Sequence, residues 1–210
     1  MNIKDCQIVL ASGSPRRREL LARESLTFQV IPAIGEEVYT ETLPEKIVAE
    51  LAKGKATEVY ERLMKAPGFF ASDARPLLVI AADTVVSIDD CILGKPKDES
   101  DAARMLRALS GRTHKVSTGF ALILKVPGHV RRTRYASETT LVTFKEMTDT
   151  DISEYIGTGE PMDKAGSYGI QGIGGKFVSG IQGDYDNVVG LPVKRVISEI
   201  EKMLQTLVVS

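Results

Sequence analysis

The sequence predicts a mixed α/β fold, in which helices flank a sheet of parallel and antiparallel strands. Segments with apolar residues at helical spacing alternate with β-prone runs along most of the chain. Two long β-prone runs, 114–126 and 134–144, are joined by a short segment that begins with Pro-Gly, so they are expected to pair antiparallel. Alternation together with one long antiparallel pair indicates a mixed sheet.

Local signals predict each element in turn. Pro15 and Pro44 suit a first helical position, and Asp98 suits a helix N-cap. The segment 66–76 is rich in turn formers and is expected to be a surface loop. The expected helices are 15–24, 44–64, 98–109, 149–159 and a C-terminal helix within 188–207. The expected strands are 7–12, 28–32, 77–88, a short return strand within 91–96, 114–126 and 134–144.

The composition excludes several functional classes. The chain has 210 residues, 43% of them hydrophobic, which is enough for one domain or two small lobes with a real core. Its 27 basic and 28 acidic residues give no general field that would attract nucleic acid or an anionic membrane. Its apolar runs are far shorter than the about 20 residues that span a bilayer, and its N-terminus resembles no signal peptide. We therefore expect a cytoplasmic protein without nucleic-acid or membrane partners, with Cys6 and Cys91 as reduced thiols.

The first candidate site is the junction between the first strand and the first helix, "ASGSPRR" at 11–17. Ser14 is placed to cap the helix, and the free backbone N–H groups of a helix start bind anions. Cations are mildly unfavourable at that position, so Arg16 and Arg17 are explained if a phosphate chain binds there. The alternative is a solvated basic patch.

Lys55 is the second candidate because of its phase on the long helix. It shares a stripe with apolar residues such as Ala52 and Val59, whereas Lys53 lies on the opposite, polar stripe. A lysine on an apolar face is rarely buried without a partner. Lys55 therefore either has a partner or reaches solvent from the edge of the stripe.

The third candidate is Asp83, which interrupts the most apolar strand. A carboxylate there costs several kcal/mol unless a cation or metal compensates it. Ligands of open α/β sheets also collect at the ends of strands. The alternative is a carboxylate that turn amides satisfy. Lys95, in "GKPKD", offers a further cation, although by itself it fits an exposed loop lysine.

The block "GEPMDKAGSYGIQG" at 159–172 is rich in glycine, which lets a backbone approach a ligand closely. Its Gln171 carries an amide that can pair with the edge of a nucleotide base. His114, at the start of a strand, is either catalytic or, as we favour, bonded to the backbone. Because the chain has two histidines and no pair of nearby cysteines, a metal would be held by oxygen ligands, which favours Mg²⁺ or Mn²⁺.

Together these blocks resemble the Maf family of nucleoside triphosphate pyrophosphatases. The matching blocks follow the family's order and cover most of the chain: "ASGSPRR", "AADTVV", "GKPKD", "LSGRTHKVSTG", "GEPMDKAGSYGIQG" and "GDYDNVVGLP". The resemblance implies one Maf-like domain over 1–210, with a bent mixed sheet and two lobes around a central cleft, similar to the inosine triphosphatase (Ham1-like) architecture. It also implies a homodimer that hydrolyses a nucleoside triphosphate to the monophosphate and pyrophosphate with a divalent cation.

The resemblance implies roles for single residues as well. Asp83 matches the proposed general base, and whether it also binds the metal stays open. The acidic pair Glu36 and Glu37 matches a metal site, with Glu37 the expected ligand. The implied phosphate-binding residues are Ser12, Ser14, Arg17, Lys55 and Lys95. The implied specificity residues, which match members acting on dTTP and UTP, are Arg16, Thr84 and Gln171.

Pyrimidine triphosphates, including 5-modified ones, are therefore the expected substrates. One alternative is a nucleotide-binding regulator of cell division without turnover, which an intact Asp83 among cations disfavours. The other is a pyrophosphatase that removes purine nucleotides such as ITP or XTP.

Overall fold

The computed structural model describes residues 1–66 and 75–206, in which seven strands, six α-helices and four short 3-10 helices occur. The strands are β1 (Gln7–Leu10), β2 (Phe28–Val30), β3 (Leu77–Ile88), β4 (Cys91–Leu93), β5 (Thr113–Lys125), β6 (Arg132–Phe144) and β7 (Val178–Gln182). The α-helices are α1 (Pro15–Ala22), α2 (Pro44–Lys65), α3 (Glu99–Leu109), α4 (Asp149–Gly157), α5 (Tyr185–Val189) and α6 (Val193–Gln205). The 3-10 helices are η1 (Ile3–Asp5), η2 (Glu160–Asp163), η3 (Ala165–Ser167) and η4 (Ile173–Phe177).

The strands form one mixed sheet in the order β2-β1-β3-β5-β6-β7, with β4 paired to the end of β3. β1 pairs in parallel with β2 and β3, whereas the other pairs are antiparallel. β5 and β6 pair along nearly their whole length, from Thr113 opposite Thr143 to Leu124 opposite Arg132. The predicted mixed α/β class and its long antiparallel pair are confirmed.

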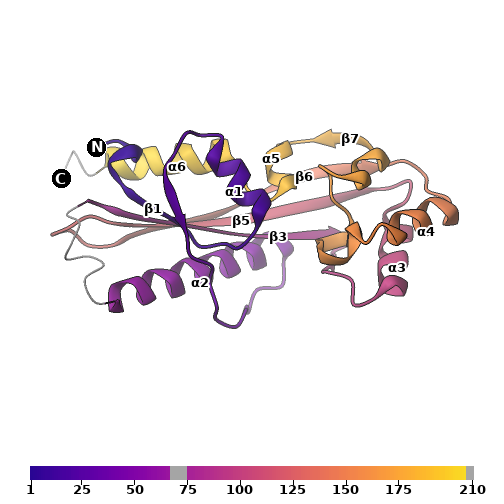
Figure 1. The fold of residues 1–210 in the computed structure, drawn as a ribbon, viewed down its shortest axis with the longest axis horizontal. Coiled ribbons are helices and arrows are strands. Elements are labelled where there is room, and N and C mark those ends of the chain that lie inside the picture. The colour runs from indigo at the N-terminus through magenta and orange to yellow at the C-terminus, as the bar shows by residue number, and fades with distance from the viewer. Residues whose placement is uncertain (67–74, 207–210) are drawn as a thin grey trace.

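Side-chain alternation along the strands divides the core into two layers on opposite faces of the sheet. Odd-numbered residues of β3, such as Leu77 and Val79, pack against α2. Even-numbered residues, such as Leu78 and Ile80, pack against α1 and α6. Figure 1 shows α2 below the sheet and α6 above it. Whether a β3 residue is odd or even therefore decides which helices its side chain meets.

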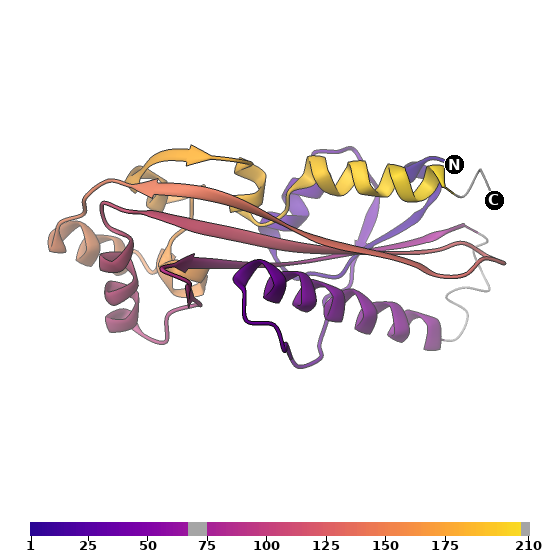
Figure 2. The ribbon, with the colours of Figure 1, turned by 180° about the vertical axis from the view of Figure 1, so that it is seen from behind.

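The long strands β3, β5 and β6 continue into a second half of the molecule. There Val86, Val116 and Val142 join a third core with α3, α4 and residues of the segment 162–178. Figure 1 and the view from behind in Figure 2 show this half at the opposite end of the strands from α2 and α6. The two halves are therefore joined by three continuous strands, which hold them at a fixed separation.

One edge of β3 is left uncovered between these halves. β1 pairs with this edge only as far as Ile80, and β4 joins it only from Val86 onwards, whereas β5 follows the other edge. The intervening residues Asp83, Thr84 and Val85 are half-buried, although the strand on either side of them is buried. Polar side chains are tolerated there because no neighbouring strand covers this edge, so the side chains stay partly accessible.

Gly119 of β5, which lies opposite Asp83, allows α2 to come very close to the sheet. A Cβ atom at position 119 would overlap the backbone of Val48 and Ala49 in α2. Only glycine is compatible with so close an approach. This contact fixes α2 over the strands, about two helical turns before Lys55.

The predicted boundaries differ from the observed ones by one to three residues for most elements, and the strand 77–88 is as predicted. The segment after 157 contains elements that were not predicted, namely η2 to η4, β7 and α5. Their glycines and isolated polar residues produce no periodic pattern. The predicted loop 66–76 lies mostly outside the described residues. Among the helices described, none combines the length and the apolar character that crossing a bilayer requires.

Candidate active site

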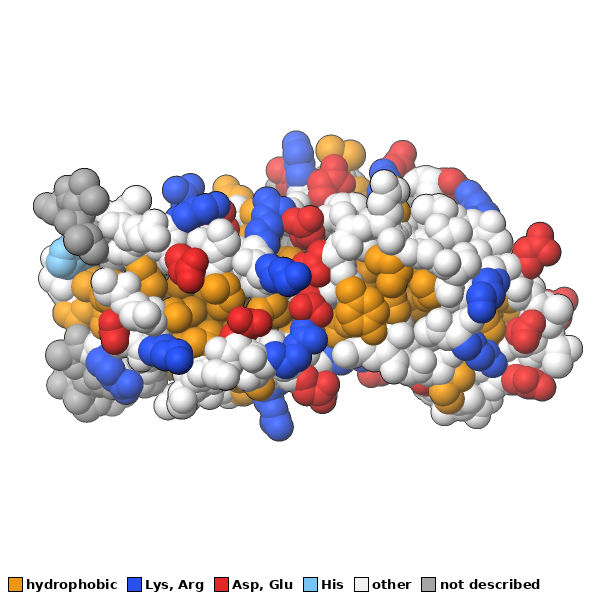
Figure 3. Space-filling view, turned by 90° about the horizontal axis from the view of Figure 1, so that it is seen from above, with side chains coloured by type: hydrophobic (Ala, Val, Ile, Leu, Met, Phe, Trp, Pro, Cys, Tyr) orange, Lys and Arg blue, Asp and Glu red, His pale blue; other side chains and the backbone are white. Residues whose placement is uncertain are grey.

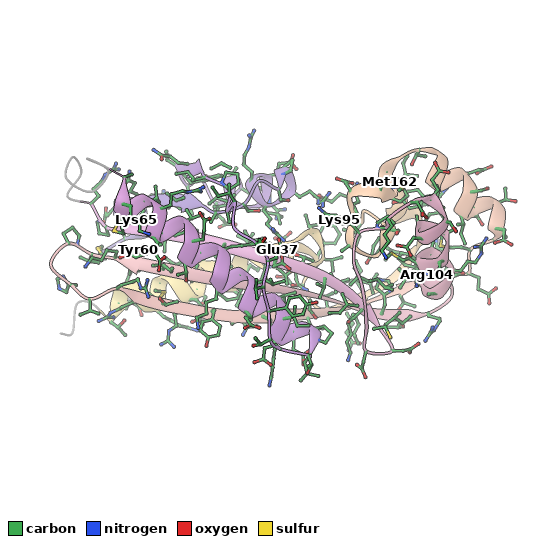
Figure 4. All side chains as sticks on the ribbon, turned by 90° about the horizontal axis from the view of Figure 1, so that it is seen from below. Glu37, Tyr60, Lys65, Lys95, Arg104 and Met162 are labelled. Atoms are coloured by element: carbon green, nitrogen blue, oxygen red, sulfur yellow. The ribbon has the colours of Figure 1, made fainter. Side chains whose placement is uncertain are left out.

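A cleft of about 880 Å³ lies beside the uncovered edge of β3. Its walls come from the start of α1, the loop before α2, α2 itself, β3, the loop after β4 and the glycine-rich segment. It is lined by all the predicted binding, metal and catalytic residues except Glu36: Ser12, Ser14, Arg16, Arg17, Glu37, Lys55, Asp83, Thr84, Lys95 and Gln171. In Figure 4, Glu37 and Lys95 lie near the middle of the molecule, between the half with α2 and the half with α3. The tertiary fold thus brings together residues from six separate stretches of sequence.

The start of α1 forms one wall of the cleft. Ser14 caps the helix by accepting a hydrogen bond from the backbone N of Arg17 at 3.5 Å, and Pro15 takes the first helical position, as predicted. Ser12 Oγ accepts a hydrogen bond from the backbone N of Ser14 at 3.3 Å, which holds the turn before the helix. The first N–H groups of a helix and its dipole both favour a bound anion.

Three neutral acceptors hold the side chain of Arg17. Its Nε donates to the carbonyl oxygen of Gly190 at 2.8 Å, Nη1 donates to Ser12 Oγ at 3.1 Å, and Nη2 donates to Thr84 Oγ1 at 3.0 Å. Because these acceptors come from three distant parts of the chain, the guanidinium is fixed in one orientation. Two of its five N–H groups have no partner among the described residues and are available to a ligand.

The guanidinium of Arg17 has no carboxylate in direct contact among the residues that the structure describes. Among residues 1–66 and 75–206, no carboxylate lies within ion-pair distance of its guanidinium. Burial lowers the pKa of Arg17, and the negative charge of Asp83 opposes that shift only in part. Because an arginine nonetheless stays protonated in proteins, the cleft contains a cation whose charge the nearby carboxylates balance only in part. A planar fork of this kind suits a phosphate group.

Lys55 is enclosed by two carboxylates. Its Nζ lies 2.5 Å from Oδ1 of Asp83 and 2.8 Å from Oε1 of Glu37, and its side chain is 18% exposed. The apolar stripe of α2 on which it was predicted is buried, and Lys53 is exposed. The alternative of a lysine that reaches solvent is therefore wrong. The alternative for Asp83 is wrong too, because Lys55 rather than turn amides satisfies its carboxylate.

Asp83 and Thr84 point to opposite faces of the sheet, and both reach the cleft. Asp83 is odd-numbered and meets Lys55 of α2, while Thr84 is even-numbered and meets Arg17 of α1. Two successive strand residues normally face separate compartments. Because the edge of β3 is uncovered at this point, the cleft wraps around it and joins the two faces.

The loop that carries Glu37 is fastened to α2 on both sides of that residue. Glu50 accepts hydrogen bonds from the backbone N of Thr40 at 2.9 Å and of Glu41 at 3.1 Å. Glu58 accepts one from the backbone N of Ile34 at 3.3 Å. The hydrogen bonds from Thr40 and Glu41 lower the pKa of Glu50. These contacts keep the carboxylate of Glu37 beside Lys55.

The glycine-rich segment 159–172 forms the opposite wall, and its own Glu160 ties it to Tyr155 of α4. The Glu160 carboxylate accepts hydrogen bonds from the Tyr155 hydroxyl at 2.8 Å, the Ile173 backbone N at 2.9 Å and the Gly174 backbone N at 3.1 Å. Burial alone would raise the pKa of Glu160, but these hydrogen bonds outweigh it and lower the pKa. The carboxylate thereby shapes the turn that carries Gln171.

Sequence reasoning missed Asp163 and Lys164, which also line the cleft. Lys164 Nζ donates to Asp163 Oδ1 at 2.6 Å and to the carbonyl oxygen of Glu160 at 2.7 Å. The hydrogen bond from Lys164 lowers the pKa of Asp163, and the positive charge of Arg16 adds to this effect. Both residues lie within the block 159–172, where adjacent opposite charges between small residues were the available signal.

His114 does not line the cleft. It is buried among aromatic rings, with Phe144 and Tyr168 packed edge-on against it. Its Nε2 forms a hydrogen bond with the Tyr168 hydroxyl at 2.9 Å, so the predicted backbone partner is wrong. Burial lowers the pKa of His114 to about 4, which keeps the ring neutral at ordinary pH.

The donor set of the cleft fits a divalent cation that binds together with phosphate. Among the described residues, no group of three or more His, Cys, Asp or Glu side chains is placed to hold a metal. Glu37 and Asp83 nevertheless converge, because both contact the same Nζ atom of Lys55. One or two carboxylates are the usual protein contribution to a Mg²⁺ site in which substrate phosphates supply further oxygens.

The capacity to bind an anion arises from this local arrangement rather than from a general positive field. Figure 3 shows charged side chains of both signs gathered across the middle of one face of the molecule. Inside the cleft, by contrast, a guanidinium that is only partly compensated lies near a carboxylate that is paired with an ammonium group. Cations that bind phosphate next to a carboxylate that can orient water are what hydrolysis of a phosphate anhydride requires.

Comparisons with known proteins agree with these features. The family model for the Maf-like protein matches residues 7–203. The dTTP/UTP pyrophosphatase of Agathobacter rectalis is 48% identical over 94% of this chain and 97% of its own length. That of Thermococcus gammatolerans is 51% identical over 89% of this chain and 91% of its own.

A solved structure of a HAM1 protein from Coxiella burnetii aligns with 96% of this chain and 99% of its own, at 16% identity and a TM-score of 0.43, which is too low to support an argument. The match of the family model over nearly the whole sequence is decisive. This chain belongs to the Maf family.

Proposed function

We propose that the protein hydrolyses dTTP and UTP, and 5-modified pyrimidine triphosphates, to the nucleoside monophosphate and pyrophosphate. The observation that supports this most strongly is the pairing of Lys55 with Asp83 beside Arg17, a cation that has no carboxylate partner in the described part of the chain. The substrates are inferred from the relatives, which are named dTTP/UTP pyrophosphatases and are about half identical to this chain.

In this proposal the phosphate chain lies along the basic side of the cleft. Arg17 contacts the phosphate chain through its two free N–H groups. Ser12 and Ser14 contact it at the turn that leads into α1. Lys55 of α2 and Lys95 of the loop after β4 bind the phosphate chain from other walls of the cleft. Such positioning and charge neutralisation account for most of the catalysis of phosphoryl transfer.

Asp83 orients a water molecule and accepts its proton as the water oxygen bonds to phosphorus. The anhydride bond between the α and β phosphates breaks, and pyrophosphate leaves with the electron pair of that bond. The hydrogen bond from Lys55 holds the carboxylate of Asp83 in place before the reaction. Glu37 and Asp83 would hold Mg²⁺ or Mn²⁺, which neutralises developing charge on the phosphate oxygens.

Base selection falls to Arg16, Thr84 and Gln171, which line the cleft on both of its walls. A polar group shaped for one base edge is left unpaired by the wrong base, which costs about 1–3 kcal/mol for each buried group. We further propose that the chain forms one Maf-like domain with two lobes, that it assembles as a homodimer and that it acts in the cytoplasm.

The direct test is pyrophosphate release from dTTP, UTP, CTP, ATP, GTP, ITP and XTP at one fixed magnesium concentration. The proposal expects dTTP and UTP to be hydrolysed fastest. A purine nucleotide ranked first would favour the purine pyrophosphatase instead. Tight binding of a triphosphate without turnover of any substrate would favour a nucleotide-binding regulator.

A further inference from the structure

The segment "GDYDNVVG", which carries α5, has no role in the function proposed above. It contacts the site through Arg17. The carbonyl oxygen of Gly190, just after α5, accepts the hydrogen bond from Arg17 Nε at 2.8 Å. The carbonyl oxygen of Asn187, within α5, accepts a hydrogen bond from Thr118 Oγ1 at 2.8 Å. Thr118 in turn lies 2.9 Å from Thr84 Oγ1, the acceptor of Arg17 Nη2.

The direction of every hydrogen bond from Arg17 through Thr84 and Thr118 to the backbone of α5 is determined. A threonine hydroxyl has one proton, and a carbonyl oxygen can only accept. Thr118 must therefore give its proton to Asn187. It follows that Thr84 gives its own proton to Thr118 and turns a lone pair towards Arg17. The sequence of donors runs from Arg17 through Thr84 and Thr118 to the backbone of α5.

The far end of this chain of hydrogen bonds is rigid. Thr118, Asn187 and Thr140 have no solvent exposure. The Asn187 side chain donates through Nδ2 to the carbonyl oxygen of Val116 at 2.9 Å and to Thr140 Oγ1 at 2.9 Å. Thr140 passes its own proton to the carbonyl oxygen of Asp184 at 2.9 Å. These bonds anchor α5 to β5 and β6, so the acceptor offered to Thr118 does not move.

We infer that Thr118 and Asn187 are positioning residues, which fix the guanidinium of Arg17 so that its two free N–H groups face a phosphate of the substrate. α5 holds that guanidinium twice, directly through Gly190 and indirectly through Thr118 and Thr84. Because the only proton of Thr84 is committed to Thr118, Thr84 does not donate to a base. Its part in base selection is therefore limited to its oxygen lone pairs and to the orientation of Arg17. The inference rests on the proposed role of Arg17 in binding phosphate.

The test is the affinity for inorganic pyrophosphate, measured by calorimetry at one fixed magnesium concentration. Thr118→Val keeps the shape of the side chain but removes its proton, so Thr84 is free to rotate and Arg17 loses its fixed acceptor. Loss of one such hydrogen bond is expected to weaken pyrophosphate binding by about fivefold to tenfold. Thr118→Ser, which keeps the hydroxyl, is expected to restore the affinity.

Ser117→Ala is the matched control. Ser117 is the buried neighbour of Thr118, and its hydroxyl lies 2.9 Å from Thr139 Oγ1, outside this chain of hydrogen bonds. The control variant is expected to bind pyrophosphate as the unchanged protein does. Equal affinities for Thr118→Val and Ser117→Ala would overturn the positioning role.

A double-substitution cycle separates positioning from a general structural effect. If Thr118 acts only through Thr84, then Thr118→Val has no further effect on affinity in a Thr84→Val background. An undiminished effect in that background would overturn the inference. Because the cycle can also be run with Thr118→Ala, it does not depend on the folding of one variant. Failure of the unchanged protein to bind pyrophosphate would instead overturn the phosphate site itself.

Discussion

Lys55 Nζ lies 2.5 Å from Oδ1 of Asp83, and the two residues are 28 positions apart in the sequence. One is on the buried face of a helix and the other is in the middle of a strand, where neither charge is stable alone. Their contact lies in the stretch 81–85 of β3, which among the described residues pairs with β5 on one edge and with no strand on the other. The same contact therefore satisfies two half-buried charges and leaves them open to a ligand.

Asp83→Asn is expected to fold and to lose at least about a hundredfold in turnover, because an amide cannot accept the proton of the attacking water. The measurement is the initial rate of pyrophosphate release from dTTP. Asp90→Asn changes an exposed aspartate in the turn after β3 and serves as the control, with the rate unchanged. A rate for Asp83→Asn within a few fold of the unchanged protein would remove Asp83 from its assigned role.

Lys55→Ala is expected to reduce kcat/KM by about a hundredfold or more, since it removes a cation at the phosphates and leaves Glu37 and Asp83 facing each other unpaired. Lys53→Ala changes a lysine two positions away that lies on the exposed face of α2, and its kcat/KM should be unchanged. The steady-state kinetics of both variants with dTTP make the comparison. Similar losses in the two variants would contradict the assignment.

Gln171→Ala is expected to flatten the preference for pyrimidines while hydrolysis of the best substrate remains measurable. Gln171 is exposed in the structure, so the penalty arises when a bound base covers its amide and leaves it unpaired. The unchanged protein should therefore prefer dTTP and UTP over ATP, GTP and ITP by roughly tenfold to a hundredfold. The measurement is kcat/KM for each nucleotide. Gln182→Ala, an exposed glutamine on β7, is the control. An unchanged ranking in the Gln171 variant would exclude it from base selection.

Gly119→Ala is expected to destabilise the protein by about 3 kcal/mol, because the added Cβ would overlap the backbone of α2 and force it away from the sheet. Gly54→Ala, in the exposed middle of the same helix with open space around it, should instead stabilise by about 0.5–1 kcal/mol. Urea unfolding measures both free energies. Equal effects would show that α2 does not depend on the glycine.

His114 should make stability depend on pH. Its pKa is about 4 in the folded protein against 6.5 as the ordinary value, so the unfolded chain binds a proton that the folded one refuses. The resulting stability is complete above pH 6.5 and is lost as the pH falls towards 4. Between pH 7.5 and pH 5 the expected loss is about 2 kcal/mol.

The measurement is the free energy of urea unfolding at those two pH values. His114→Gln should lack this part of the pH dependence, whereas His129→Gln, which changes an exposed histidine, should keep it. A pH dependence that is the same in all three proteins would mean that His114 titrates normally.

The sequence by itself determined most of the elements before residue 158 and most of the charged residues that line the cleft. The spacing of apolar residues located α2 and placed Lys55 rather than Lys53 on its buried face. The fixed periodicity of a helix decides which of its positions face inwards. The apolar run of β3 similarly marked Asp83 as a charge in need of a partner. The conclusions about Lys55 and Asp83 both depend on residues that are near one another in the sequence, so a local sequence pattern is enough to reach them.

Only the tertiary structure decided which partner each of these residues has. Lys55 meets Asp83 because Gly119 lets α2 approach the sheet, and Arg17 meets Gly190 because α5 folds back 173 positions later. The partner of His114 is Tyr168, 54 positions away, rather than the nearby backbone. Contacts over such separations follow from how the sheet twists and where β1 stops, and these depend on the packing of the whole chain.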